Sequence, residues 1–222
     1  MEVTISRCPG RVKCFIGKFW YNKNMKKIGQ GWQYTVYDLE NGKVLKKFHS
    51  WAKAYVVIFK EIFPFNDDSF FEIPSFIKDM KIKVDDSLRI IKTKNIPKEW
   101  MANPKFVNKY DFEQDKVIPL HDIFEKLNTE ESKGIINQFV DFNKKFLEIG
   151  VIDKSFNITK NYGINLTGDI VLIDIGELYD DKELIAKQFK NRVWDKSYVS
   201  GCIKDEEVQK YFIQQMDKNF VI

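Results

Sequence analysis

The stretch NYGINLTGDIVLIDIGEL, residues 161–178, does the most to determine the fold. Its centre, Leu166-Thr167-Gly168-Asp169, has the composition of a tight turn, and the apolar run at 170–173 has the character of a buried strand. We therefore predict a hairpin that closes the central region of the chain and carries Asn161 back toward Asp174, where the second strand ends.

An amide and a carboxylate brought together in this way suggest a cation site. Asp174 lies at the mouth of the strand, and the hairpin places Asn161 opposite it. Magnesium prefers hard oxygen ligands and is usually held by one or two carboxylates together with phosphate oxygens. The hairpin thus predicts a Mg²⁺ site formed by Asn161 and Asp174 beside bound phosphates.

A second motif, IGQGWQYTVY at residues 28–37, places Gly29 and Gly31 in the turn before a strand. Glycine lets backbone N–H groups approach phosphate oxygens, because no Cβ stands in the way. The Asn41-Gly42 pair then predicts a hairpin from strand 33–39 to strand 44–48. Lys46 and Lys47 point to opposite faces of the return strand, and a register slip would exchange them as the phosphate-binding lysine.

The remaining elements follow from periodicity. Helical spacing predicts helices at 50–63 and 130–149, and two more between 181 and 217. Residues 87–92 and 106–113 are predicted to be later strands of the first sheet. The chain should therefore be α+β, with a β-rich first half and a mainly helical second half.

These motifs together resemble the protein-kinase-like superfamily over roughly residues 27–180. In that family an asparagine ends the catalytic loop and an Asp-Phe-Gly motif follows thirteen residues later, as Asp174 follows Asn161 here, with Ile175 in place of the phenylalanine. The resemblance implies a bilobal fold that binds Mg-ATP between its lobes. It also implies an N-terminal extension at 1–26, an N-terminal lobe at 27–115 and a reduced C-terminal lobe at 116–222.

The resemblance implies roles for further residues. The nucleotide would contact Gly29, Gly31, Val36 and Lys46, and Lys46 fits the family pattern better than Lys47 because it shares a face with Val44. Glu61 would pair with the strand lysine, since it is the only carboxylate in residues 50–63. The link that begins at Glu113 would present backbone groups to the adenine edge.

The catalytic base departs from the family pattern. The family places an aspartate five residues before the asparagine, where this chain has Phe156. Asp153 lies eight residues before Asn161 and could reach the site from a longer loop, where it would accept the proton of an attacking hydroxyl. Asn157 is an alternative loop asparagine, seventeen residues before Asp174. The absence of the usual histidine and arginine beside Asp153 disfavours ordinary protein-kinase activity.

The resemblance therefore implies an ATP-dependent phosphotransferase. Only 48 residues follow Asp174, which favours a small-molecule, sugar, lipid or dedicated protein acceptor over peptide docking on a large platform. A pseudokinase, which would bind nucleotide as a regulatory module without catalysis, is the alternative. Some family members transfer a nucleotide instead of a phosphoryl group, so the reaction class also stays open.

Composition limits the other classes. The net charge of +4 is spread along 222 residues, which disfavours a nucleic-acid partner, although a basic nucleic-acid binder remains a third interpretation. Basic residues interrupt the N-terminal region, so we expect neither a signal peptide nor a membrane span. Three cysteines without metal-site spacing indicate a reduced, cytoplasmic protein.

Overall fold

The computed structural model describes residues 25–62, 72–195 and 203–220, apart from the side chains of residues 61 and 62. The predicted N-terminal extension at 1–26 lies outside the described residues except for its last two positions. All three cysteines lie outside them as well.

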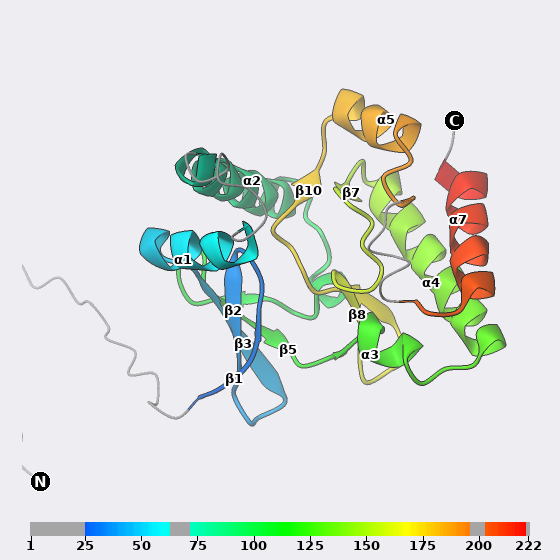
Figure 1. Cartoon of the computed structure of the whole chain (residues 1–222), viewed down its shortest axis with the longest axis horizontal. Helices are drawn as coiled ribbons and strands as arrows, with labels where there is room; N and C mark the ends of the chain where they lie inside the picture. Colours follow the sequence, from blue (N-terminus) through cyan, green and yellow to red (C-terminus); the bar gives the residue numbers. More distant parts are fainter. Residues whose placement is uncertain (1–24, 63–71, 196–202, 221–222) are drawn as a thin grey trace, which may run out of the picture.

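A five-stranded antiparallel sheet forms the N-terminal part of the chain, with strand order β1-β2-β3-β5-β4 (Figure 1). Its strands are β1 (Lys26–Gln30), β2 (Tyr34–Asp38), β3 (Lys43–Phe48), β4 (Lys105–Phe106) and β5 (Phe112–Asp115). The predicted hairpin is present as β2 and β3, and Glu40 and Gly42 in its turn adopt positive φ angles of 59° and 77°. Val36 pairs with Lys46 across this hairpin, so their side chains lie on the same face.

Two helices, α1 (Trp51–Ile62) and α2 (Ile73–Thr93), lie side by side next to this sheet (Figure 1). The prediction of a strand at 87–92 is wrong, because these residues form the last turns of α2. Buried residues follow a helical period along it: Ile73, Ile77, Met80, Val84, Ser87 and Ile90. The prediction was misled by the adjacent β-branched residues Ile90 and Ile91 near the C-terminal end of the helix.

The predicted strand at 106–113 is also wrong as a single element, because the chain turns back within it. The Asn108 side chain accepts hydrogen bonds from the N–H groups of Tyr110 and Asp111, at 2.9 and 2.8 Å. This turn separates β4 from β5, which pair with each other in the sheet. An asparagine side chain that accepts hydrogen bonds from backbone N–H groups two and three residues later favours a turn over a continuous strand.

The C-terminal part is mainly helical, with short strands at the boundary to the first sheet. Its helices are α3 (Leu120–Phe124), α4 (Thr129–Glu148), α5 (Lys182–Lys190) and α7 (Glu206–Phe220), and the 3-10 helix η2 (Lys98–Met101) precedes them. The short strands are β6 (Ile118–Pro119), β7 (Ile152–Asp153), β8 (Tyr162–Ile164), β9 (Ile170–Leu172) and β10 (Leu178–Tyr179). β6, β8 and β9 form one antiparallel sheet, and β7 pairs with β10.

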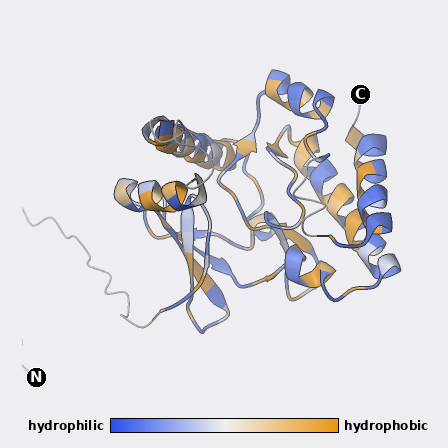
Figure 2. Ribbon diagram, viewed as in Figure 1, coloured by the Kyte–Doolittle hydropathy of each residue, from blue (hydrophilic) through white to orange (hydrophobic). Residues whose placement is uncertain are grey.

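Helix α4 confirms the helix that was predicted at 130–149. Asn128 and Glu131 form a capping box at its start, and an apolar stripe follows at helical spacing. The stripe packs against α7, so the two helices lie side by side (Figure 1). Figure 2 shows hydrophobic and hydrophilic residues alternating along both helices, as expected for elements with one face in the core.

The architecture is α+β, as predicted. One hydrophobic core extends from Tyr34 and Phe112 of the first sheet to Phe212 and Phe220 of α7. A smaller cluster between α1 and α2 contains Ile58 and Ile77, among others. Within the described residues, no helix combines the length and the apolar character that crossing a membrane requires.

Gly163 is the position where backbone packing in this region is tightest. A Cβ atom at Gly163 would lie 2.7 Å from Val117 Cγ2 and 2.8 Å from the Ile118 carbonyl oxygen. We expect Gly163→Ala to lower the free energy of unfolding by about 1–3 kcal/mol, because β6 and β8 would have to separate. Chemical denaturation measures this change.

Gly134, exposed in the second turn of α4, provides the matched control, since a Cβ there meets no atom within 4 Å. Gly134→Ala should raise the free energy of unfolding by about 0.5–1 kcal/mol through helix propensity. Equal effects of the two substitutions would show that the β6–β8 contact is not tight.

Candidate functional site

Asp153 occupies the end of β7, immediately after α4. Gly150 ends that helix with a φ of +70°, which a residue with a side chain rarely adopts, and β7 begins two residues later. Asp153 pairs with Leu178 of β10, so the short strand fixes its backbone next to the segment that follows Asp174. The side chain is buried.

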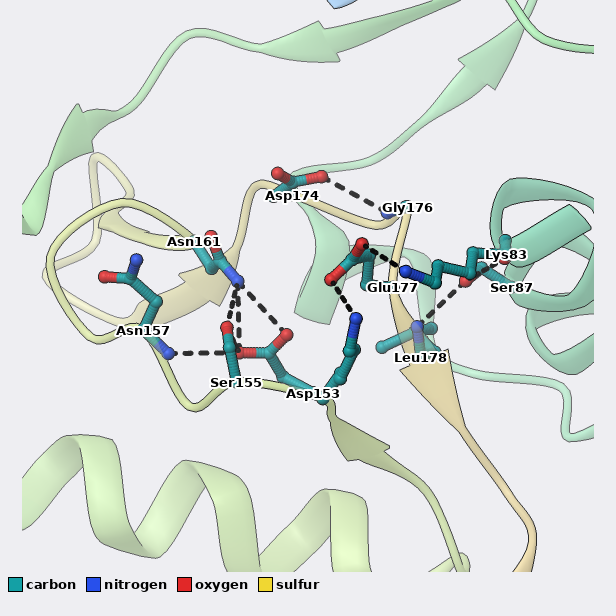
Figure 3. Close-up of polar contacts among 11 residues, drawn as sticks. Lys83, Ser87, Asp153, Ser155, Asn157, Asn161, Asp174, Gly176, Glu177 and Leu178 are labelled. Atoms are coloured by element: carbon teal, nitrogen blue, oxygen red, sulfur yellow. Dashed lines mark hydrogen bonds and ion pairs between the residues drawn. The ribbon is translucent and has the colours of Figure 1, made fainter. Parts of the chain in front are cut away.

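The carboxylate of Asp153 is bonded to Asn161 (Figure 3). Asn161 Nδ2 lies 3.1 Å from each carboxylate oxygen of Asp153 and 3.2 Å from Ser155 Oγ. The N–H of Asn157 donates a weaker bond of 3.3 Å to the same carboxylate. Asp153 and Asn161 are therefore in direct contact, although eight residues separate them in the sequence.

Asn157, the alternative loop asparagine, has a different role. Its side-chain oxygen accepts from Thr159 Oγ1 at 3.0 Å and from the N–H of Lys160 at 3.3 Å. These contacts stabilise the turn between β7 and β8. Asn157 thus shapes the loop, and Asn161 is the asparagine at the site.

The backbone carries Asn161 to Asp174. The Asn161 carbonyl accepts from the N–H groups of Ile173 and Asp174, at 2.7 and 3.2 Å, and one carboxylate oxygen of Asp174 accepts from the N–H of Gly176 at 3.2 Å. Figure 3 shows the Asn161 side chain between Asp153 and Asp174. Because Asn161 Nδ2 faces Asp153, its Oδ1 faces away from that carboxylate.

The donor set around Asp174 suits magnesium better than a transition metal. The described residues contain no group of three or more histidine, cysteine, aspartate or glutamate side chains that could hold an ion. Asp174 and Asn161 offer one carboxylate and one amide oxygen. Magnesium commonly binds few protein oxygens and completes its shell with water and substrate phosphates.

Burial and neighbouring charges raise the pKa of Asp153 to about 7. Desolvation is the largest cause, and the carboxylates of Asp174 and Glu177 raise it further. The hydrogen bonds from Asn161 and from the Asn157 N–H act in the opposite direction. A carboxyl with a pKa near neutrality can both accept and release a proton at physiological pH.

Lys46, and not Lys47, reaches the site. Its ammonium group donates to the carbonyl oxygen of Ile173, the residue before Asp174. Burial lowers the pKa of Lys46, and the charge of Asp174 opposes that shift. Lys47 is exposed on the other face of β3.

The glycine turn lies over the Asp-Ile-Gly segment through Gln33, which sequence reasoning missed. The Gln33 side chain is 8% exposed, and its Oε1 occupies the space where a Cβ of Gly176 would be, 1.8 Å from that position. Gly176 therefore permits the turn to approach. A Cβ atom at Gly29 would lie 3.7 Å from Val36 Cβ, which is ordinary contact. A Cβ atom at Gly31 would meet no atom within 4 Å.

A second missed group links α2 to the site (Figure 3). The carboxylate of Glu177 lies 3.4 Å from Lys154 Nζ and 3.9 Å from Lys83 Nζ of α2. The N–H of Leu178 donates to Ser87 Oγ at 2.8 Å. Lys83 and Ser87 are 91 to 94 residues away in sequence from these partners, so no local pattern could reveal the contacts.

The structure does not bring Glu113 together with these residues. The side chain of Glu61 lies outside the described residues, and Glu113 sits within β5 between Leu45 and Lys105. In the link after β5, the N–H groups of Asp115 and Lys116 already donate to Ala102 and Gly42, at 2.8 and 2.9 Å. These two amides are therefore unavailable to a purine edge.

The arrangement defines an α+β protein with a polar site at the junction of its sheets. No protein-family profile matches the sequence, and no curated protein matches it significantly. Among solved structures, the chain is similar to Rv3197 from Mycobacterium tuberculosis, determined as a complex with erythromycin, with 12% sequence identity and a TM-score of 0.43. That similarity covers 86% of this chain but 53% of Rv3197, so the chain spans about half the length of that protein.

Proposed function

We propose that this chain is an ATP-dependent phosphotransferase of the protein-kinase-like superfamily that acts on a hydroxyl of a small-molecule, sugar, lipid or dedicated protein acceptor. The observation that carries the proposal is the convergence of Lys46 from β3, Asp153 from β7, Asn161 from just before β8 and Asp174 from just after β9. Phosphoryl transfer is catalysed mainly by positioning and by charge, and this set provides both.

Each residue has a separate task in the proposed reaction. Lys46 neutralises phosphate charge, and Asp174 and Asn161 Oδ1 would hold Mg²⁺, which supplies charge neutralisation on the transferred group. Asp153 orients the acceptor hydroxyl and accepts its proton as the new O–P bond forms. The bond between the γ-phosphorus and the β-γ bridging oxygen breaks, and the leaving group is ADP.

The two proposed lobes are joined by the segment that connects β5 to β6. The chain leaves the five-stranded sheet at Asp115 and enters the three-stranded sheet at Ile118. We place the boundary between lobes 27–115 and 116–222 in this link. Nucleotide would lie between the face of the first sheet that carries Lys46 and the segment ending at Asp174.

Thermal unfolding with ATP, in the presence and absence of Mg²⁺, tests nucleotide binding. A ligand that binds only the folded chain stabilises it by about 2.7 kcal/mol at one hundred times its Kd. We expect wild type to show a magnesium-dependent shift and Asp174→Asn to lose it. Asp141→Asn, which removes a charge at an exposed position of α4, should keep the full shift.

The absence of any shift in wild type at saturating ATP would contradict the proposal. The regulatory alternative is favoured by one contact, since Lys46 donates to a backbone carbonyl and not to a carboxylate. Magnesium-dependent binding with no measurable ATP turnover by the wild-type chain would support that alternative.

A further inference from the structure

A row of side chains crosses three strands on the face of the first sheet that points away from Lys46. Thr35 of β2 pairs with Gln30 of β1 on one side and with Lys47 of β3 on the other. Directly opposed residues of antiparallel strands project from the same face. Thr35 is completely buried, whereas Gln30 and Lys47 are exposed.

Three lysines from three elements gather around Thr35. Lys53 of α1 donates to Thr35 Oγ1 at 2.6 Å, and Lys27 of β1 donates to Gln30 Oε1 at 2.5 Å. Lys47 is the cross-strand neighbour of Thr35. Burial lowers the pKa of Lys53, and the charges of Lys27 and Lys47 lower it further, as expected for cations held close together.

Among the described residues, none of these three lysines has a carboxylate partner. Other lysines of the same sheet do, since Lys43 pairs with Asp115 at 3.4 Å and Lys116 with Asp38 at 2.6 Å. A surface that leaves like charges together without a counterion favours an anion from outside.

A directed chain of hydrogen bonds holds Lys53 in place. The Nδ1–H of His49 donates to the Trp32 carbonyl at 2.9 Å, and burial lowers the pKa of His49, which favours the neutral ring with its proton on Nδ1. Its Nε2 must then accept, so the Thr35 hydroxyl donates to it at 2.9 Å. The oxygen of that hydroxyl accepts from Lys53, which keeps its other ammonium protons available.

We propose that Lys27, Lys47 and Lys53 form a binding site for a compact phosphoryl anion, on the face of the sheet opposite Lys46. The three cations surround a single threonine instead of following a line, which suits one multiply charged group better than an extended polyanion. The free ammonium protons of Lys53 would face that group. This site is independent of the proposed phosphotransferase activity.

Titration of the full chain with inorganic phosphate, followed by thermal unfolding at constant ionic strength, tests this site. We expect the melting temperature of wild type to rise by about 3–6 °C when phosphate reaches ten times its Kd. The double substitution Lys47→Gln and Lys53→Gln should abolish the rise. Lys46→Met should retain it, because Lys46 lies on the other face, and this separates the site from the nucleotide site.

The matched control removes two charges elsewhere, through Lys187→Gln and Lys190→Gln on the exposed surface of α5. This control should respond to phosphate as wild type does. Loss of the response in the control, or in Lys46→Met alone, would overturn the assignment, as would an unchanged response in the Lys47 and Lys53 double variant.

Two further readouts complete the test. Without phosphate, the Lys47 and Lys53 double variant should be at least as stable as wild type, because repulsion among the three lysines is relieved. A clear loss of stability would show that Lys47 and Lys53 stabilise the fold and do not form an anion site. Pyrophosphate and a phosphoserine peptide distinguish the source of the anion: the peptide binds more tightly if the partner is a phosphorylated protein, and pyrophosphate if it is a free phosphate compound.

Discussion

In the phosphotransfer reaction that we propose, replacing Asp153 with asparagine should lower the turnover number by about 100- to 10,000-fold, the usual contribution of a positioned general base. The carboxylate is buried and held by Asn161, and an asparagine in its place has no group that accepts the proton as a carboxylate does. Steady-state ATP turnover measures the loss. Binding of Mg-ATP should persist, because Lys46, Asn161 and Asp174 are unchanged.

The control for this experiment is again Asp141→Asn, which should retain wild-type turnover. Equal turnover by wild type and Asp153→Asn would remove Asp153 from the reaction. Because binding and turnover are measured separately, a variant that binds nucleotide without turning it over is distinguished from one that has lost its fold.

The free energy of unfolding of the wild-type chain should fall by about 2–3 kcal/mol between pH 4.5 and pH 8 through Asp153 alone. The pKa of this carboxyl is about 7 in the folded chain, and in the unfolded chain it takes the ordinary aspartate value of 3.8. Between these values the folded state holds a proton that the unfolded state has released, so stability decreases as pH rises. Above about pH 8 the carboxyl is ionised in both states and the loss is complete.

Urea unfolding in magnesium-free buffer at several pH values measures this dependence. Asp153→Asn should show a shallower decline, by the same 2–3 kcal/mol, because asparagine does not titrate. Parallel curves for the two proteins would show that the carboxyl of Asp153 has an ordinary pKa.

The sequence was sufficient for elements whose signal is local. The Asn41-Gly42 turn predicted the β2–β3 hairpin, and the apolar stripe at helical spacing predicted α4. The β8–β9 hairpin followed from its turn composition and brought Asn161 to Asp174 as expected. Each of these depends on residues within about twenty positions of one another.

Contacts between distant segments could not be obtained in this way. Gln33 and Gly176 meet only because the first sheet packs over the Asp-Ile-Gly segment, and Lys83 meets Glu177 only because α2 lies against β10. Helix α2 itself was missed because a short β-like stretch near its end outweighed a longer period that spans 21 residues. Local composition misleads when the periodicity is examined in too short a window.

The Ser87 hydroxyl has a consequence for the dynamics of the molecule. It accepts from Leu178 and donates to the Lys83 carbonyl, so one side chain joins the backbone of α2 to the strand that pairs with Asp153. We therefore expect a ligand that immobilises the segment around Asp174 to slow hydrogen exchange of the α2 amides near Ser87. Coupling between two binding sites is reciprocal. A protein or small molecule that displaced α2 would therefore weaken ligand binding near Asp174, and the ligand would weaken the binding of that partner by the same free energy.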